Sequence, residues 1–281
     1  MSEGSPGNPG APHVDWTLIT VTYNSAEALQ HFVAQPVPDN VEWLVVDNAS
    51  RDDSVATATG LGAHVCALPR NRGFSAANNA ALGVARGRYV AFVNPDVTVD
   101  YADLRLLSRY LDDAPEPLLL APQLLDPDGT VQPNGRGVPT LRRKVAHRVN
   151  DQHQEGYRIF ADPNTRRCIS WAMGAAVIGH RSTFAALGGW DERFFVYYED
   201  HDLGLRSWRQ GVPVVLMGDV RWIHGWARET TGRSWAAWKL ELHGMAKFFA
   251  RYPTLLLTTR GLGRRWSRMY ADVGSVYPTQ T

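Results

Sequence analysis

Carboxylates that follow apolar runs are the first candidates for chemistry in this sequence. Asp47 comes directly after Val41–Val46, and Asp96 comes shortly after Tyr89–Val93. At Asp96, a carboxylate at the end of a buried strand can hold Mg²⁺ or Mn²⁺, because these hard cations prefer oxygen ligands and suit diphosphates. Asp47 could instead accept a hydrogen bond from a base N–H or a ribose hydroxyl. Asp is also common in turns and helix caps, so a purely structural role stays open for each position. His224, at the end of a later strand-like run, is a further candidate ligand, although a single histidine is more often a structural hydrogen-bonding residue.

A second acidic group, Glu199-Asp200-His201-Asp202, places three carboxylates within four residues. Their mutual repulsion costs stability unless the site binds a charge or performs a function. A helix is predicted to begin here, and the positive end of its dipole favours negative charge, which keeps Asp200 ionised and able to act as a base. Asp202 lies four residues before Arg206, and we interpret it as one half of an ion pair. A capped, solvated helix start is the structural alternative for the whole group.

The elements that position these residues alternate over the first hundred residues. Strands are predicted at 18–22, 41–46, 63–68 and 89–93. Helices are predicted at 26–34, from Asp53 onward, and from an N-cap at Ser75 through Ala85, where Gly87 ends the last of these. Such alternation indicates a parallel, doubly wound sheet, in which ligands bind beyond the carboxyl ends of the strands. Asn24, Asp47, Asn71 and Asp96 all fall at those ends.

The rest of the chain is less regular. A helix is predicted at 101–113, and residues 115–168 lack strong periodicity apart from the turn at Asp126–Gly129. Strand-like runs at 171–178 and 212–217 flank a helix of about ten residues that starts near Glu199. A further amphipathic helix is predicted at 235–251.

Six ordered segments together resemble the inverting glycosyltransferases of family 2 with the GT-A fold, and among them the rhamnosyltransferase-like branch. The segments are 21–25 (VTYNS), 45–50 (VVDNAS), 71–79 (NRGFSAANN), 92–96 (FVNPD), 188–195 (GGWDERFF) and 198–203 (YEDHDL). The resemblance implies an α/β, Rossmann-like fold with a mostly parallel central sheet flanked by helices and a helical C-terminal extension. We expect a GT-A domain at 14–232, with a nucleotide-binding half (14–100) and an acceptor-binding half (101–232). Residues 1–13, rich in Gly, Pro and Ser, are predicted to be a disordered tail, and residues 233–281 a basic helical extension.

The resemblance also implies roles for individual residues. Tyr23 and Asp47 would hold the nucleobase, Asp200 would be the catalytic base with Glu199 beside it, and Asp96 with His224 would bind Mg²⁺ or Mn²⁺. The donor-binding residues it implies are Thr22, Tyr23, Asn24, Asp47, Asn71, Gly73, Asn78, Asn94 and Asp96. The acceptor-binding residues are Trp190, Asp191 and Trp226. Asn94 stands where the broad family has Asp, which favours the rhamnosyltransferase-like branch and removes one charge from the metal site.

The expected reaction is direct displacement at an anomeric carbon, with a donor of the dTDP or UDP type and dTDP-β-L-rhamnose favoured. The acceptor would be a glycan, a lipid-linked sugar or a small molecule. A sugar-nucleotidyltransferase is an alternative, but the loop after the first strand, Tyr23-Asn24-Ser25, lacks the glycines and basic residues that hold a triphosphate. A non-catalytic sugar-binding protein is a second alternative, based on ten tryptophans, seven of which lie between Trp171 and Trp238.

Composition and charge limit the classes of partner and the cellular location expected for this protein. The chain has 281 residues with 29 basic and 28 acidic side chains, so the net charge of +1 argues against a nucleic-acid partner. No apolar run is long enough to span a membrane, no signal peptide is apparent, and two cysteines fit a reducing cytoplasm. Residues 201–281 hold 12 basic and 5 acidic side chains, a net charge of +7. This excess, with Arg260, Arg264, Arg265 and Arg268, predicts contact with a diphosphate, peripheral contact with the inner face of the cell membrane, or a solvated tail.

Overall fold

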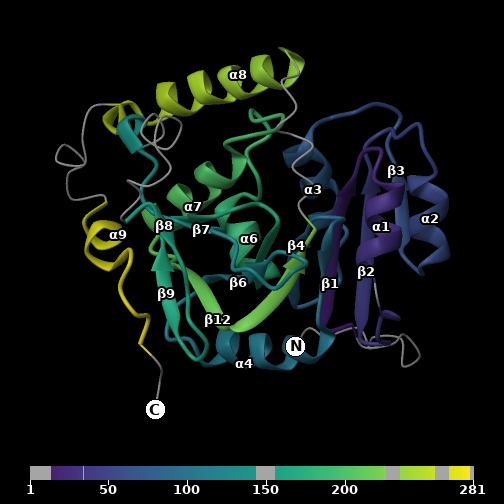
Figure 1. The fold of residues 1–281 in the computed structure, drawn as a ribbon, viewed down its shortest axis with the longest axis horizontal. Helices are drawn as coiled ribbons and strands as arrows, with labels where there is room; N and C mark the ends of the chain where they lie inside the picture. The colour runs from purple at the N-terminus through teal and green to yellow at the C-terminus, as the bar shows by residue number, and fades with distance from the viewer. Residues whose placement is uncertain (1–13, 34, 144–155, 226–234, 257–265, 279–281) are drawn as a thin grey trace, which may run out of the picture.

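Strands and helices alternate over the first hundred residues of the computed structural model, which describes residues 14–33, 35–143, 156–225, 235–256 and 266–278 (Figure 1). The elements are β1 (Trp16–Thr22), α1 (Ala26–Phe32), β2 (Val41–Asp47), α2 (Ser54–Gly60), β3 (His64–Ala67), α3 (Phe74–Leu82) and β4 (Tyr89–Val93). β1 pairs in parallel with β2 and with β4, and β2 pairs in parallel with β3. Because β1 lies between β2 and β4, the chain changes direction across the sheet here, at the point where such folds bind ligands.

The second half of the chain extends the same sheet. Its elements are β5 (Val97–Thr98), η1 (Tyr101–Asp103), α4 (Leu104–Asp113), β6 (Leu119–Leu125), β9 (Arg166–Ile169), β11 (Ala176–His180), α6 (Arg181–Leu187), α7 (Glu199–Arg209) and β12 (Val214–His224). The strand order is β3-β2-β1-β4-β11-β6-β12-β5, with β9 also paired to β12. β6 and β12 are parallel, whereas β11 is antiparallel to both neighbours. A small second sheet contains β10 (Trp171–Ala172), β7 (Gly135–Arg136) and β8 (Arg158–Ile159). The predicted α/β fold with a mostly parallel central sheet is confirmed.

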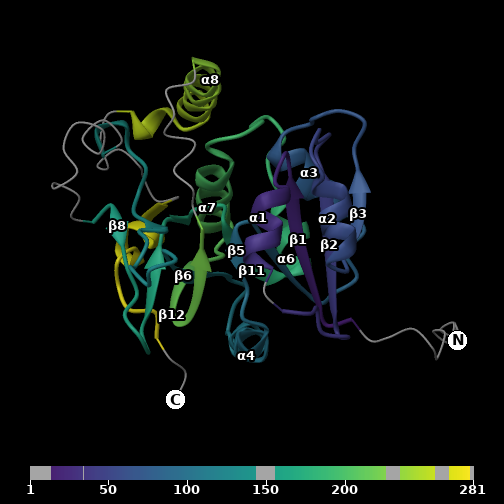
Figure 2. The same ribbon diagram turned by 45° about the vertical axis from the view of Figure 1, so that its right-hand side comes forward.

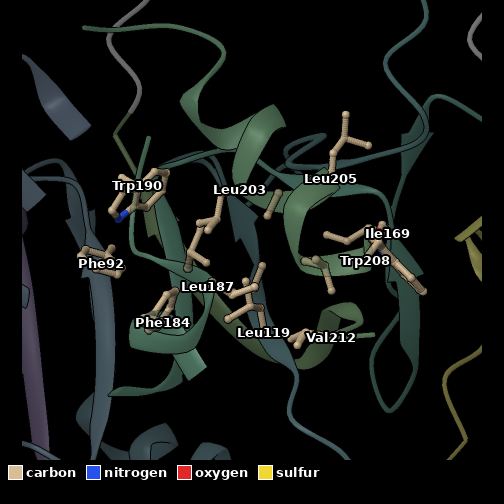
Figure 3. Close-up of a cluster of buried hydrophobic side chains, with 14 of the residues drawn as sticks. Phe92, Leu119, Ile169, Phe184, Leu187, Trp190, Leu203, Leu205, Trp208 and Val212 are labelled. Carbon is tan, nitrogen blue, oxygen red and sulfur yellow. The ribbon is translucent and has the colours of Figure 1, made fainter. Parts of the chain in front are cut away.

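Two hydrophobic clusters cover the two faces of the sheet. Successive residues of a strand point to opposite faces, so Leu18 belongs to one cluster and Ile19 to the other. Helices α1, α2 and α4 pack on the Leu18 face, and α3, α6 and α7 pack on the Ile19 face. Figure 3 shows the Ile19-face cluster, where Phe92, Phe184 and Trp190 meet side chains from α7. The sheet is therefore buried on both faces, so a functional site has to lie at the ends of its strands.

Helix α3 differs at both ends from its prediction. It begins at Phe74, with Gly73 rather than Ser75 at the N-cap, and it ends at Leu82 with Gly83 as C-cap. The backbone N–H of Phe74 donates to the carbonyl of Phe195 at 2.7 Å, so a distant segment satisfies the first turn that Ser75 was expected to cap. Gly87, which was predicted to end this helix, instead allows a close approach to β1. A Cβ at Gly87 would lie 2.5 Å from the backbone nitrogen of Thr17.

Strand β6 was not predicted, because Pro122 and Gln123 interrupt its apolar pattern, although the turn that follows it was. The N–H of Gly129 donates to the carbonyl of Asp126 at 2.8 Å. The two-residue strands β7 and β8 were also too short to predict.

The C-terminal region is helical, as predicted, with α8 (Trp235–Arg251), η3 (Pro253–Leu255) and α9 (Ser267–Asp272). Figures 1 and 2 both place α8 at the opposite end of the molecule from α4, above α7. The chain then returns to the edge of β9, where Cys168 N–H donates to the Ser275 carbonyl and Tyr277 N–H to the Arg166 carbonyl. The C-terminal residues thus join the main sheet region, which no sequence pattern had indicated.

Candidate active site

The carboxyl ends of β1 and β2 bring Thr22 and Asp47 together. The two residues are in register, and Thr22 Oγ1 donates to Asp47 Oδ1 at 3.1 Å. The backbone N–H of Ser50 donates to Asp47 Oδ2 at 3.0 Å. Asp47 is buried, so these bonds fix its carboxylate, while each carboxylate oxygen retains further acceptor capacity.

The turns after β1 and β2 are bonded to each other beside Asp47. The N–H of Asn24 donates to Ser50 Oγ at 2.9 Å, and Asn24 Oδ1 accepts from the N–H of Arg51 at 2.8 Å. Asn24 has a φ of 54°, a conformation that Asn adopts more readily than most residues. Tyr23, on the same turn, is 51% exposed. The double turn thus presents an aromatic ring to solvent next to the buried carboxylate.

The loop before α3 approaches from the neighbouring strand. Asn71 Oδ1 accepts from the N–H of Gly73 at 2.9 Å. Gly73 has a φ of 84°, and a Cβ there would lie 2.5 Å from the Phe195 carbonyl oxygen, so only glycine fits. Asn78 was expected to line a donor pocket, but it is buried in α3, where its Nδ2 donates to the Phe74 carbonyl at 3.1 Å. Its role at the donor pocket stays a prediction.

Asp96 and His224, far apart in sequence, face each other where β5 pairs with β12. His224 is in register with Val97, and Gly225 N–H donates to the Asp96 carbonyl at 2.7 Å. His224 Nε2 lies 3.4 Å from Asp96 Oδ2. Asn94 lies on the same loop, and its backbone N–H donates to the Ala175 carbonyl. The predicted metal-binding pair is therefore assembled by the antiparallel contact of two strand ends.

The donor set of this pair suits a divalent cation. A carboxylate oxygen and an imidazole nitrogen can both be ligands of a divalent cation such as Mn²⁺. Across the described ranges, no group of three His, Cys, Asp or Glu side chains is arranged to hold a metal ion. Cations at nucleotide sites often use only one or two protein ligands and complete their shell with phosphate oxygens and water. Asp96 and His224 fit that pattern.

The acidic group at the start of α7 contains a fixed carboxylate. Asp200 Oδ1 accepts from the backbone N–H of His201 at 2.8 Å and lies 2.6 Å from His201 Nδ1. The His201 ring stacks on Trp171, with centroids 3.5 Å apart, and contacts Tyr198. His201 thereby orients Asp200, a role that the sequence prediction missed although His201 lies within the motif.

Glu199, beside Asp200, is a buried carboxyl group. Burial, and next the charge of Asp200, raises the pKa of Glu199 to about 8. Its Oε2 has no hydrogen-bond partner within the part of the chain that the structure describes. Glu199 is therefore mostly protonated at neutral pH.

Comparison with known proteins identifies the family. Residues 17–158 match the sequence family described as Glycosyl transferase family 2. This chain belongs to glycosyl transferase family 2. It is 31% identical over 235 residues to the N-acetylglucosaminyl-diphospho-decaprenol L-rhamnosyltransferase of Mycobacterium tuberculosis, with 76% of each protein covered. The protein is thus a glycosyltransferase of the hexosyltransferase type, and neither a nucleotidyltransferase nor a pure sugar-binding protein.

Solved structures support the GT-A fold of this glycosyltransferase. The mannosyltransferase PcManGT of Pyrobaculum calidifontis, in complex with GDP-Man and Mn²⁺, superposes with a TM-score of 0.55 at 18% identity, covering 86% of this chain and 65% of that one. S. aureus TarS 1-349 also has a TM-score of 0.55, at 16% identity, covering 92% and 78%. At these identities the likeness concerns the fold alone.

Trp190 and Asp191, two residues predicted to bind the acceptor, make contacts within the protein. Trp190 is only 1% exposed and packs edge-on against Phe92 and Phe74, so we correct it to a core residue. Asp191 pairs with Arg193 and with Arg251 of α8, the latter at 2.8 Å. Trp226 lies outside the described residues.

Asn79 and Arg251, which the sequence did not single out, organise this loop. Asn79 bonds both the N–H and the carbonyl of Trp190 at 2.8 Å. Asp202 forms the predicted ion pair with Arg206 at 2.7 Å and also pairs with Arg251 at 2.9 Å. The adjacent Asn78-Asn79 was a signal for the first residue, whereas Arg251 comes from a helix with no motif.

Proposed function

We propose that this glycosyltransferase moves L-rhamnose from dTDP-β-L-rhamnose to an acceptor hydroxyl with inversion of the anomeric carbon. The observation that carries the proposal is the convergence of Asp96 and His224 at the same end of the sheet as the Thr22–Asp47 pair. The similarity to an L-rhamnosyltransferase over three quarters of the chain supports the choice of sugar. A donor of the UDP type is the alternative.

The donor site would use three surfaces. Tyr23 offers an exposed ring for the nucleobase, and Asp47 offers carboxylate acceptors for base or ribose. Asn71 and Gly73 form the loop on the other side. Asp96 and His224 would hold Mg²⁺ or Mn²⁺, which would neutralise charge on the departing nucleoside diphosphate.

Asp200 is the proposed general base. Its carboxylate removes the proton from the acceptor hydroxyl while that oxygen forms a bond to the anomeric carbon. The bond from that carbon to the diphosphate oxygen breaks, and the electron pair leaves with the nucleoside diphosphate. Attack from the opposite face converts the β-linked donor to an α-L-rhamnoside.

A lipid-linked diphosphate sugar is the proposed acceptor, as in the name of the mycobacterial relative. A cavity of about 340 Å³ between the Trp190 loop and α8 is lined by Arg193, Phe194, Lys247, Ala250 and Arg251. Three of these five residues are basic: Arg193 and Arg251 pair with the predicted acceptor residue Asp191, and the Lys247 ammonium donates to the Arg193 carbonyl at 2.6 Å. Such a lining suits an anionic group attached to an apolar chain.

Peripheral membrane contact would bring the enzyme to such an acceptor at the inner face of the cell membrane. In α8, Trp235 is 75% exposed, Trp238 40% and Leu242 48%, and this spacing places them along one side with Lys239. No helix in the described ranges is long and apolar enough to cross a bilayer. Arg268 pairs with Glu116 and Asp272, so its charge is largely neutralised. Arg260, Arg264 and Arg265 lie outside the described residues.

These proposed sites assign a separate role to each of three segments of the chain. Residues 14–100 would bind the nucleotide, residues 101–232 would bind the acceptor and supply the base, and residues 233–281 would contact the membrane. The proposal rests on the positions of Thr22 and Asp47 in the first part, Asp200 in the second and α8 in the third.

The test is a panel of nucleotide sugars measured by thermal shift and by release of nucleoside diphosphate. We expect dTDP-β-L-rhamnose to raise the melting temperature most, because a ligand that binds only the folded state stabilises it by mass action. Nucleotide release should stop in EDTA and return with Mn²⁺ or Mg²⁺. Full activity in EDTA would contradict the metal role, and a stronger response to another nucleotide sugar would contradict the donor.

A further inference from the structure

His224 is held on the side away from Asp96 by a buried glutamine. His224 Nδ1 lies 2.8 Å from Gln132 Oε1, and both side chains are buried. Gln132 follows β6 and is tied to it by the bond from its backbone N–H to the Leu124 carbonyl and by the bond from Gln123 Nε2 to its own carbonyl. The residue therefore has a fixed position next to the proposed metal pair.

The orientation of the Gln132 amide is set by two acceptors. Its Nε2 donates to Asp126 Oδ1 at 2.7 Å and to the backbone carbonyl of His224 at 2.9 Å. A carboxylate and a carbonyl only accept hydrogen bonds, so the NH₂ group must face them. Turning the amide over would set its oxygen against two acceptors. Oε1 is therefore the atom that faces the His224 ring.

This orientation decides which nitrogen of His224 carries the proton. An amide oxygen needs a donor, so Nδ1 is protonated. In the neutral ring the unprotonated nitrogen is then Nε2, which is the atom 3.4 Å from Asp96 Oδ2. An unprotonated imidazole nitrogen next to a carboxylate is the state that binds a divalent cation.

We propose that Gln132, oriented by Asp126, is a positioning residue that selects the Nδ1–H tautomer of His224 and so prepares the Asp96–His224 pair for a divalent cation. The inference rests on the proposed function, because it assigns a supporting residue to the proposed metal site. Histidines that bind metals generally donate their other ring N–H to an acceptor, and losing that acceptor typically weakens metal affinity about 10- to 100-fold.

The test compares Gln132→Met with Gln123→Met. Both changes remove a buried amide from the same region, but Gln123 meets Gln132 at its backbone carbonyl, which also accepts from the Asn134 N–H, whereas the Gln132 amide itself contacts the His224 ring. Nitrogen NMR of the metal-free wild type should show His224 as the Nδ1–H tautomer. Mn²⁺ titration with dTDP present should give about 10- to 100-fold weaker binding for Gln132→Met and near wild-type binding for Gln123→Met. Asp126→Ala, which frees the amide without altering Gln132, should weaken Mn²⁺ binding in the same direction and serves if Gln132→Met does not fold.

The outcomes separate this inference from the proposed metal site. Wild-type Mn²⁺ affinity in Gln132→Met, or an Nε2–H tautomer in the wild type, overturns the inference alone. His224→Ala and Asp96→Asn test the metal site itself. If neither weakens Mn²⁺ binding, the proposed metal role fails and this inference fails with it.

Discussion

At the scale of single residues, the environment of Asp200 defines how the proposed base works. One of its oxygens accepts from both the backbone and the ring of His201, and the ring is fixed by stacking on Trp171. These contacts hold the carboxylate in one orientation at the start of α7. Orientation matters for proton transfer, because displacement of a catalytic group by about 1 Å can cost up to about 100-fold in rate.

Replacing His201 tests this role. His201→Phe keeps an aromatic ring to stack on Trp171 but removes the ring N–H, so kcat should fall about 10- to 100-fold with little change in donor KM. His201→Asn is the matched control, because its side-chain amide can place a donor where Nδ1 lies. Equal activity of the Phe and Asn variants would show that the hydrogen bond from His201 does not position the base.

The pKa of Glu199 predicts a pH-dependent stability. Because burial raises the pKa of Glu199 to about 8 in the folded state, from the ordinary 4.5, the folded protein holds a proton that the unfolded chain has released. The stability linked to this proton is complete below about pH 4.5 and is lost as the pH rises to about 8. Glu199→Gln cannot ionise, so its melting temperature relative to wild type should increase between pH 5 and pH 9. A difference that stays constant over this range would contradict the assignment.

Residue roles could be predicted from the sequence where a motif and a strand end coincide. Asp96 and His224 were predicted as a pair, and the structure brings them together through β5 and β12. Trp190 and Asn78 lie within recognisable motifs, but their burial depends on packing between segments that the sequence does not reveal. Gln132 lies in a region without periodicity, so no local pattern marked it.

At the scale of elements, helix α8 supports the turn that precedes the base. Tyr197 and Tyr198 have φ values of 68° and 73°, two consecutive left-handed residues without glycine. Such a conformation is costly and persists only where surrounding contacts hold it. Gly244 of α8 comes so close that a Cβ there would lie 2.9 Å from the Tyr197 carbonyl oxygen. Phe248 of the same helix contacts the rings of Tyr198 and His201.

A Gly→Ala substitution in α8 should therefore affect the active site. Gly→Ala inside a helix ordinarily stabilises by about 0.5–1 kcal/mol. Gly244→Ala should instead lower both the melting temperature and kcat, because the helix must move away from Tyr197. Gly83→Ala is the matched control, since its Cβ would make only ordinary contacts at 3.5 Å. A stabilised and fully active Gly244→Ala would show that α8 does not support this turn.

Most elements followed from periodicity and turn residues, and the exceptions have physical causes. The buried strands β1, β2 and β4 and the amphipathic α8 have strong patterns over enough residues to be recognised. Helix α3 was misplaced because the Phe195 carbonyl, from far along the chain, caps its start. β6 was missed because a proline and a glutamine stand inside a buried strand.

At the scale of the whole molecule, the exposed side of α8 is the candidate for membrane contact. Trp235 and Trp238 are amphipathic side chains of the kind that settle at lipid headgroups. The Trp235→Ala/Trp238→Ala double variant should sediment less with vesicles that contain anionic lipid, while turnover of a short, water-soluble acceptor stays near the wild-type level. Val84→Ala is the control, because Val84 is 67% exposed just after α3. Equal vesicle binding by the wild type, the double tryptophan variant and Val84→Ala would show that Trp235 and Trp238 of α8 do not contact the membrane.

Asp200→Asn is the decisive variant for the proposal that Asp200 is the base in an inverting sugar transfer. The substitution keeps the shape of the side chain and removes its ability to take a proton. With dTDP-β-L-rhamnose, Mn²⁺ and a lipid-linked diphosphate sugar, we expect the wild type to release dTDP and form an α-L-rhamnoside. Asp200→Asn should lose roughly 10²-fold or more in turnover while its donor affinity is retained. Wild-type turnover in Asp200→Asn, or a β-linked product, would contradict the account.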